Sequence, residues 1–169
     1  MPITTVLGHV SRAMDFFNKQ NLFFAFGKQT PWEDEDFPDI LDPEITEIVE
    51  PLGYKMIENK YMVVPDNENG TIMYRDSRWR TIPFDKAIEE KSRWVYIECF
   101  LRYDELPLGT YRQIGVYSNL IRADETPIGK MALVDNEIKD HGILEFVDNI
   151  RRVTRQLEQR EHFSLIIEF

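Results

Sequence analysis

The sequence is poor in residues that build several common kinds of functional site. Its one cysteine, Cys99, allows neither a disulfide framework nor a cysteine-based zinc cluster, and a reducing compartment is expected. The eight glycines are never clustered, so no loop of the kind that cradles phosphate groups is present. The three histidines, His9, His141 and His162, are too far apart in sequence to form a local metal pair. These shortages predict no cofactor and no metal.

Long hydrophobic runs are also missing. No apolar run reaches the roughly 18 residues that a membrane-spanning helix needs. The N-terminus, "MPITTVLGHVSRAMDFF", has no basic region followed by a continuous apolar stretch. We therefore expect neither a membrane span nor this kind of export signal, and no membrane as a partner.

Positive charge is scarce. The chain has 20 Lys and Arg against 30 Asp and Glu, which gives a formal net charge of −10. Such a charge disfavours binding to the phosphates of nucleic acids, so nucleic acid is not an expected partner. With 169 residues, of which 43% are hydrophobic, the chain is long enough for one domain with a sizeable core, with or without a short arm.

The first 28 residues predict a helix followed by a strand. Between residues 5 and 19, apolar side chains recur at helical spacing, and Thr4 or Thr5 can cap the helix at its start. The run "NLFFAFGK" is short, aromatic and rich in strand formers, so we expect a strand there.

Residues 29–53 predict an extended acidic arm or linker. No Lys or Arg lies between Lys28 and Lys55, whereas nine Asp and Glu do. The four prolines at positions 31, 38, 43 and 51 disfavour helical backbone at the residues before them. At most one helical turn or short strand is expected, around "EITEIVE".

Residues 54–169 predict a mainly antiparallel β domain. The runs "YKMIENKYMVV", "TIMYR" and "RWRTI" are separated by turn residues, for which a meander is the simplest account. Further strands are expected at "RWVYIECFLRY", "YRQIGVYSNLI", "GILEFVDN" and the closing "HFSLIIEF". The fold class is therefore α+β, with an N-terminal helix, an acidic arm and a mainly antiparallel sheet.

The stretch "TPWEDEDFPD", residues 30–39, is a candidate site. Its four consecutive acids, Glu33, Asp34, Glu35 and Asp36, lack the glycine and the alternating spacing of a calcium loop. Nothing in the sequence encloses them in a cleft that would separate two carboxyl pKa values, so we predict no catalytic residue. The flanking Trp32 and Phe37 are typical of interface anchors, and the alternative is that they pack on their own domain.

The second candidate surface is basic. Four arginines, Arg151, Arg152, Arg155 and Arg160, form the one basic concentration of this acidic chain. They can bind an acidic surface on a partner or on another copy of the chain. The alternatives are a solvated face or pairing with the protein's own acids.

Three stretches together resemble the baseplate wedge proteins of contractile-tailed bacteriophages, the T-even-like group and its relatives. They are "LFFAFGKQTPWEDEDFP", "TYRQIGVYSNL" and the closing "GILEFVDNIRRVTRQLEQREHFSLIIEF". Two details depart from the family pattern. Phe37-Pro38 stands where the family often has two prolines, and Ile150 interrupts an Asn-Arg pair.

The resemblance implies a structural subunit of the virion tail baseplate with no enzymatic activity. Wedge proteins assemble in the host cytoplasm into a hetero-oligomeric sector, and six sectors surround the tail hub and support sheath contraction and infection. The implied partners are other wedge proteins, together with hub or sheath-initiating proteins. The acidic arm and the arginine-rich stretch would then be docking surfaces.

Three alternatives stay open from the sequence. A neck or tail-completion protein would also be a structural part of a phage. A small acidic metal-binding hydrolase would need Asp, Glu and His that are distant in sequence to converge in the fold. A host-directed inhibitor that mimics nucleic acid would use the acidity itself.

Overall fold

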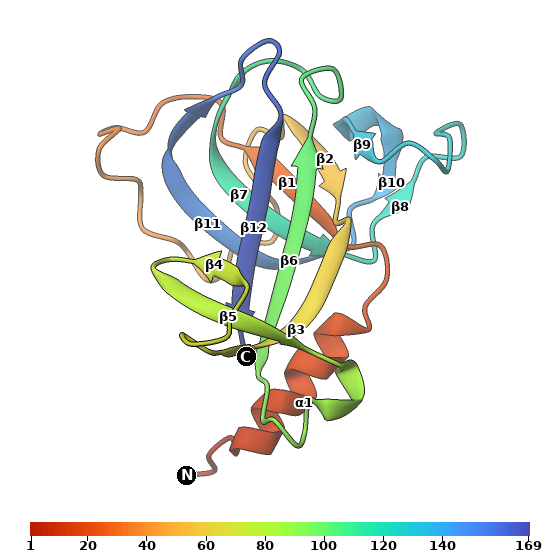
Figure 1. The fold of residues 1–169 in the computed structure, drawn as a ribbon. Coiled ribbons are helices and arrows are strands. Elements are labelled where there is room, and N and C mark those ends of the chain that lie inside the picture. The colour runs from red at the N-terminus through yellow and green to blue at the C-terminus, as the bar shows by residue number, and fades with distance from the viewer. The chain divides into compact units, whose positions relative to one another are not determined.

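In the computed structural model, which describes all 169 residues, the chain forms two compact units (Figure 1). One contains Met1–Lys19, Glu58–Glu98 and Phe163–Phe169, and the other contains Gln20–Ile57 and Cys99–His162. The sequence predicts a division of the chain into three consecutive ranges, 1–28, 29–53 and 54–169. Each compact unit, in contrast, is built from stretches that are distant in sequence.

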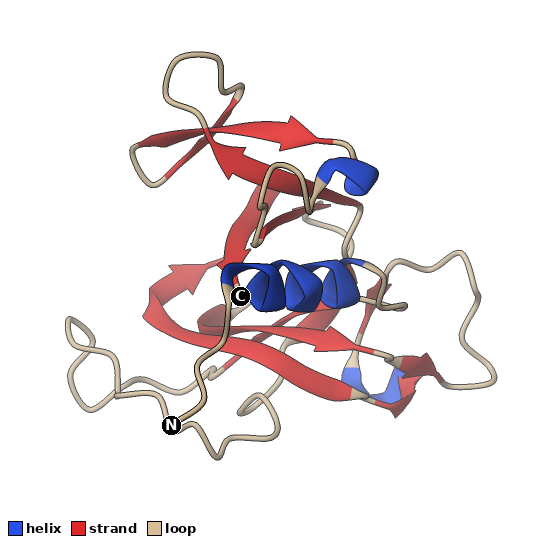
Figure 2. Ribbon diagram, turned by 90° about the horizontal axis from the view of Figure 1, so that it is seen from below, coloured by secondary structure: helices blue, strands red, loops and turns tan.

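Strands dominate both units, and the N-terminal helix is the one α-helix (Figure 2). The first unit contains α1 (Val6–Phe17), β3 (Asn59–Pro65), β4 (Ile72–Tyr74), β5 (Ser77–Ile82) and the 3-10 turn η1 (Phe84–Lys86), with most of β6 (Trp94–Leu101) and β12 (Glu161–Glu168). The second contains β1 (Phe23–Gly27), β2 (Gly53–Met56), β7 (Thr110–Ser118), β8 (Ile121–Arg122), β9 (Ala132–Leu133), η2 (Asp135–Glu137), β10 (Ile138–Asp140) and β11 (Ile143–Thr154).

Helix α1 confirms the predicted N-terminal helix. The hydroxyl oxygen of Thr5 accepts a hydrogen bond from the Gly8 backbone N–H at 3.1 Å, which caps the helix at its start. Val10, Ala13 and Phe16 are buried along one face, as their spacing requires. None of the helices has the length and hydrophobicity needed to cross a bilayer.

The sheet of the first unit has the order β12-β6-β3-β5-β4. The predicted meander is wrong here, because β5 lies between β3 and β4. Arg75 and Asp76 both have positive φ and form a two-residue turn between β4 and β5. Strand β5 then pairs with β3 and brings the buried Ile82 opposite the buried Met62, whereas three-residue β4 has no buried residue. The strand that contributes a buried side chain, β5, therefore lies inside the sheet, and β4 lies at its edge.

The main sheet of the second unit has the order β11-β7-β1-β2-β9, and each neighbouring pair is antiparallel. All five residues of β1 are buried, and β7 is buried along most of its length. The strands expected from "NLFFAFGK" and "YRQIGVYSNLI" are therefore confirmed as neighbours inside one sheet. The fold is α+β with mainly antiparallel sheets, as predicted.

The turn before β11 provides a test of this sheet's register. Gly142 has φ of +75°, and a Cβ placed there would lie 1.9 Å from the Ser118 carbonyl oxygen. We expect Gly142→Ala to lower the free energy of unfolding by about 2 kcal/mol or more, because it adds backbone strain and a clash. Gly129→Ala is the control, since no heavy atom outside Gly129 and its two chain neighbours lies within 4 Å of the added Cβ. Equal urea midpoints for the two variants would contradict this account.

Candidate functional site

The acidic segment, residues 28–52, forms neither helix nor strand and belongs to the second unit. Its two ends lie close together, because the Lys28 N–H donates to the Val49 carbonyl and the Leu52 N–H donates to the Phe26 carbonyl. The segment is thus a closed loop on its own sheet, and the extended form expected from the sequence is not confirmed. No regular turn of helix or strand forms around "EITEIVE" either.

Two apolar side chains hold the acidic segment to the sheet. Trp32 is 7% exposed, and its Nε1–H donates to the Ile150 carbonyl on β11 at 3.0 Å. Ile48 is buried in a core cluster with Phe23 and Tyr117, and its backbone N–H donates to the Tyr117 hydroxyl at 2.8 Å. Burial with a satisfied polar group makes both contacts favourable.

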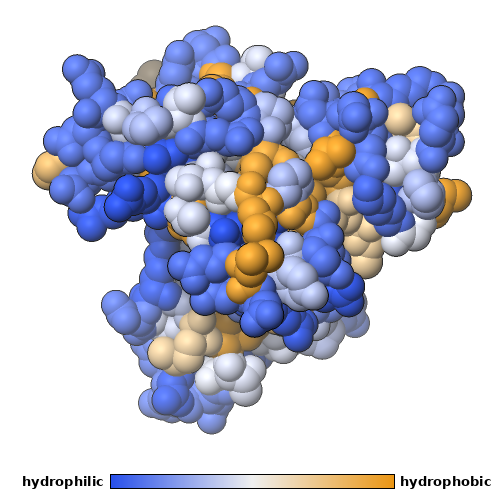
Figure 3. Space-filling model, turned by 90° about the horizontal axis from the view of Figure 1, so that it is seen from above, coloured by the Kyte–Doolittle hydropathy of each residue, from blue (hydrophilic) through white to orange (hydrophobic).

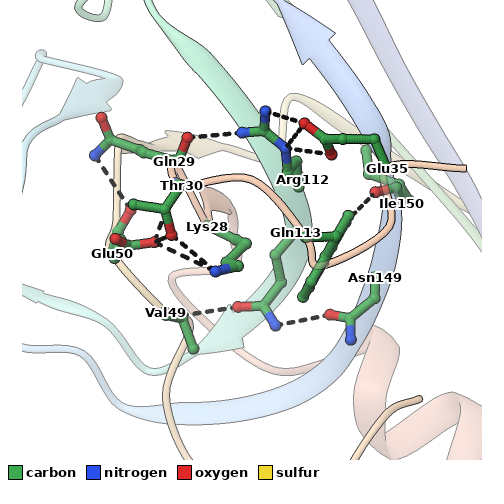
Figure 4. A network of polar contacts seen from close by, with 11 residues as sticks. Lys28, Gln29, Thr30, Glu35, Val49, Glu50, Arg112, Gln113, Asn149 and Ile150 are labelled. Atoms are coloured by element: carbon green, nitrogen blue, oxygen red, sulfur yellow. Dashed lines mark hydrogen bonds and ion pairs between the residues drawn. The ribbon is translucent and has the colours of Figure 1, made fainter. Parts of the chain in front are cut away.

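An ion pair fastens the middle of the acidic stretch (Figure 4). The Arg112 side chain on β7 is 5% exposed, and its Nε donates to both carboxylate oxygens of Glu35 at 2.9 and 2.7 Å. Its Nη1 donates to the Gln29 carbonyl at 2.6 Å. These hydrogen bonds lower the pKa of Glu35 and raise the pKa of Arg112. Of the four consecutive acids, Glu35 therefore forms an ion pair within its own protein.

A chain of amide groups supports the same region (Figure 4). Gln113 is buried. Its Oε1 accepts a hydrogen bond from the Val49 N–H at 2.8 Å, and its Nε2 donates one to Asn149 Oδ1, also at 2.8 Å. Asn149 in turn donates to the Asp39 carbonyl at 2.9 Å. Sequence reasoning missed Arg112, Gln113 and Asn149. The sequence does contain one signal, the adjacent Arg112 and Gln113 within a predicted strand that is otherwise mostly apolar. Polar side chains that are buried in such a strand need hydrogen-bonding partners elsewhere in the fold.

The base of the loop is closed by Glu50. Its carboxylate accepts hydrogen bonds from the Thr30 N–H at 3.2 Å and the Thr30 hydroxyl at 2.8 Å. Hydrogen bonds from Thr30 lower the pKa of Glu50, and Lys28 Nζ lies 4.0 Å away. The Gln29 side chain donates to the carbonyls of Glu50 and Pro51.

The ten residues predicted to dock onto partners differ in exposure. Trp32 and Arg155 are buried, and Glu35 is half-buried. The exposed ones are Glu33, Asp34, Asp36, Phe37, Arg151, Arg152 and Arg160. The docking role itself stays a prediction for this set.

Arg155 is an internal residue. It is 4% exposed, and its Nε donates to Glu161 at 2.9 Å. Its other nitrogens donate to the carbonyls of Arg102, Leu106 and Pro107. Arg155 therefore pairs with groups of its own protein, whereas the other three arginines of the stretch lie at the surface.

The titratable groups do not assemble into a metal cluster. No group of three or more His, Cys, Asp or Glu side chains is placed to hold a metal ion. Asp135 Oδ1 accepts a hydrogen bond from the Tyr54 hydroxyl at 3.0 Å and lies 2.8 Å from His141 Nε2. Burial raises the pKa of Tyr54, so its hydroxyl stays protonated and acts as a hydrogen-bond donor.

Comparison with known proteins gives two matches over the whole chain. Residues 1–169 match the model of a family described as "Baseplate wedge 3 tail fiber network component". The chain is also similar to "Virion protein 3" of Enterococcus phage phiEF24C, with 31% identity over 176 residues. That alignment covers 99% of this chain and 96% of the phage protein. Both matches therefore include the acidic segment as well as the sheets.

The role of Trp32 can be tested against its exposed neighbour Phe37. We expect Trp32→Ala to lower the free energy of unfolding by about 3 kcal/mol, because it empties a buried site. It should also speed proteolysis within residues 33–47. Phe37→Ala should change stability by less than about 0.5 kcal/mol, since Phe37 is 74% exposed. Similar unfolding midpoints and cleavage rates for the two variants would contradict this role.

The Arg112–Glu35 pair predicts a pH-dependent stability. The pKa of Glu35 lies below its ordinary value of 4.5, so its stabilisation is complete above about pH 4.5 and is lost as the pH falls through the folded-state pKa. We expect the Tm difference between wild type and Glu35→Gln to be largest near neutral pH and to shrink in acid. Glu33→Gln, which removes an exposed acid, should show no such trend. A Glu35→Gln difference that is constant with pH would count against the pair.

Proposed function

Because the chain belongs to the family of baseplate wedge 3 tail fiber network components, we propose that it is a structural wedge subunit in the tail baseplate of a contractile-tailed bacteriophage. The observation that carries this proposal is the family match over residues 1–169. Family members are structural components of the phage virion, and we extend that non-enzymatic role to this chain.

The stretches that carry the resemblance also meet in space, which supports a role for this region. They contribute β1, β7 and β11, which are neighbours in one sheet. Trp32 of the first stretch contacts Ile150 of the third, and Glu35 of the first contacts Arg112 of the second. The motif residues thus hold the acidic segment in place at the surface of the second unit.

In this proposal the chain assembles with other wedge proteins in the host cytoplasm. The resulting sector is one of six around the tail hub, with hub or sheath-initiating proteins as further neighbours, and it supports sheath contraction. The docking surfaces are the exposed part of the acidic segment and the exposed arginines, namely Glu33, Asp34, Asp36, Phe37, Arg151, Arg152 and Arg160. Trp32, Glu35 and Arg155 contribute by holding these surfaces in position.

Quantitative mass spectrometry of purified virions tests this function. We expect the chain to be present in a multiple of six copies and to remain with the baseplate when tails are dissociated. Phage that lack the gene should accumulate incomplete baseplates. Absence from virions would contradict the proposal, and recovery with the neck would favour the tail-completion alternative.

A further inference from the structure

Two hollows flank the middle of the acidic segment. One, of about 330 Å³, lies between residues 41–45 and the start of β11, where Leu144 and Phe146 line it. The other, of about 250 Å³, is lined by Trp32 and Asn149 among others. The two hollows share Leu41, Asp42 and Ile45 as lining residues, so we name them together the Leu41 groove.

Large apolar side chains of the segment remain exposed around this groove. Ile40 is 97% exposed, Leu41 37% and Val49 44%, and all three line the groove. Phe37, three residues before Ile40, is 74% exposed. Hydrophilic side chains cover most of the face drawn in Figure 3. Clustered apolar exposure of this kind is typical of a surface that a partner covers.

Unpaired negative charge surrounds the same side chains. Of the nine acids between Lys28 and Lys55, Glu35 pairs with Arg112 and Glu50 lies near Lys28. The other seven have no cationic side chain within ion-pair distance: Glu33, Asp34, Asp36, Asp39, Asp42, Glu44 and Glu47. Asp39 and Asp42 line the groove itself. Acids held together in this way create a local negative potential that attracts cations.

The charge also indicates which kind of partner fits. A second copy of the chain would bring a further net charge of −10, which opposes association. A surface that combines exposed apolar side chains with unpaired carboxylates instead complements apolar side chains flanked by ammonium or guanidinium groups.

We propose that the Leu41 groove binds a segment of another baseplate protein in which apolar side chains are flanked by Lys or Arg. The inference rests on the proposed function for the identity of the partner. The apolar side chains enter the groove and cover Ile40 and Leu41, while the basic residues pair with Asp39 and Asp42.

Short overlapping peptides covering the other structural proteins of the same virion provide the probe, with the intact chain as the receptor. We expect the bound peptides to combine apolar residues with flanking Lys or Arg, and to bind more weakly at higher salt. Ile40→Ser with Leu41→Ser should weaken binding about tenfold. Asp39→Asn with Asp42→Asn should weaken it severalfold and reduce its salt dependence.

The controls use residues outside the groove with similar exposure. Ile128→Ser changes an apolar side chain that is 90% exposed, and Glu68→Gln removes an exposed acid. Both should bind peptides as the wild type does. Because Ile40 is almost fully exposed, Ile40→Ser alone should leave the unfolding midpoint unchanged and still weaken binding, which separates a loss of binding from a loss of folding.

Several outcomes would overturn the inference. They are no peptide binding, binding that the Ile40→Ser and Leu41→Ser variant keeps, or self-association of the chain that this variant abolishes.

Phage that carry the Ile40→Ser and Leu41→Ser variant distinguish a failure of the proposed function from a failure of the groove inference. If the wild-type chain is absent from virions, the proposed function fails. If it is present and the variant is incorporated equally and binds peptides equally, only the groove inference fails.

Discussion

The burial of Arg112 is the constraint on which the surface of the second unit depends. A guanidinium on the nearly fully buried strand β7 is costly unless a carboxylate and further acceptors compensate for its lost hydration. No acid within its own strand does this, so the carboxylate comes from Glu35, 77 residues earlier in the chain. The need to pair one charge therefore brings an acidic stretch back onto the sheet. Trp32 and Ile48 then add buried apolar contacts on either side of the pair.

This arrangement divides the acidic segment into two kinds of residue. Three residues of the segment contact the sheet: Glu35 pairs with Arg112, Trp32 donates to the Ile150 carbonyl, and the Ile48 N–H donates to the Tyr117 hydroxyl. Glu50 closes the base of the loop through Thr30. Most of the side chains between Glu35 and Ile48 are exposed. The unpaired acids and the exposed Ile40 and Leu41 thus follow from how the segment is fastened. The fold and the proposed docking surface are consequences of the same few contacts.

Local features of the structure could be predicted from the sequence, and non-local pairing could not. Helix α1 follows from apolar spacing and a Thr5 cap, both of which lie within a few residues. Strands β1 and β7 follow from their composition. The order of β3, β5 and β4 depends on which strand buries Ile82, and the contact between Trp32 and Ile150 joins residues 118 apart. Composition gave no signal for either, so Trp32 could be assigned equally to an interface or to its own domain. Arg155 was similarly ambiguous, because three backbone carbonyls and Glu161 hold it only after the chain has folded.

Because the acidic segment is already held on its own sheet, the entropy cost of ordering it on binding is small. An arm without structure of its own would gain order only on its neighbours, and the entropy of ordering would weaken each contact. Here the ion pair at Arg112, the amide chain through Gln113 and the buried Trp32 have already fixed the backbone. A partner that docks on Ile40, Leu41 and the free acids then orders only side chains, which costs less than ordering a chain segment. The buried charge that needs a partner within the fold therefore also fixes the backbone beneath the proposed docking surface.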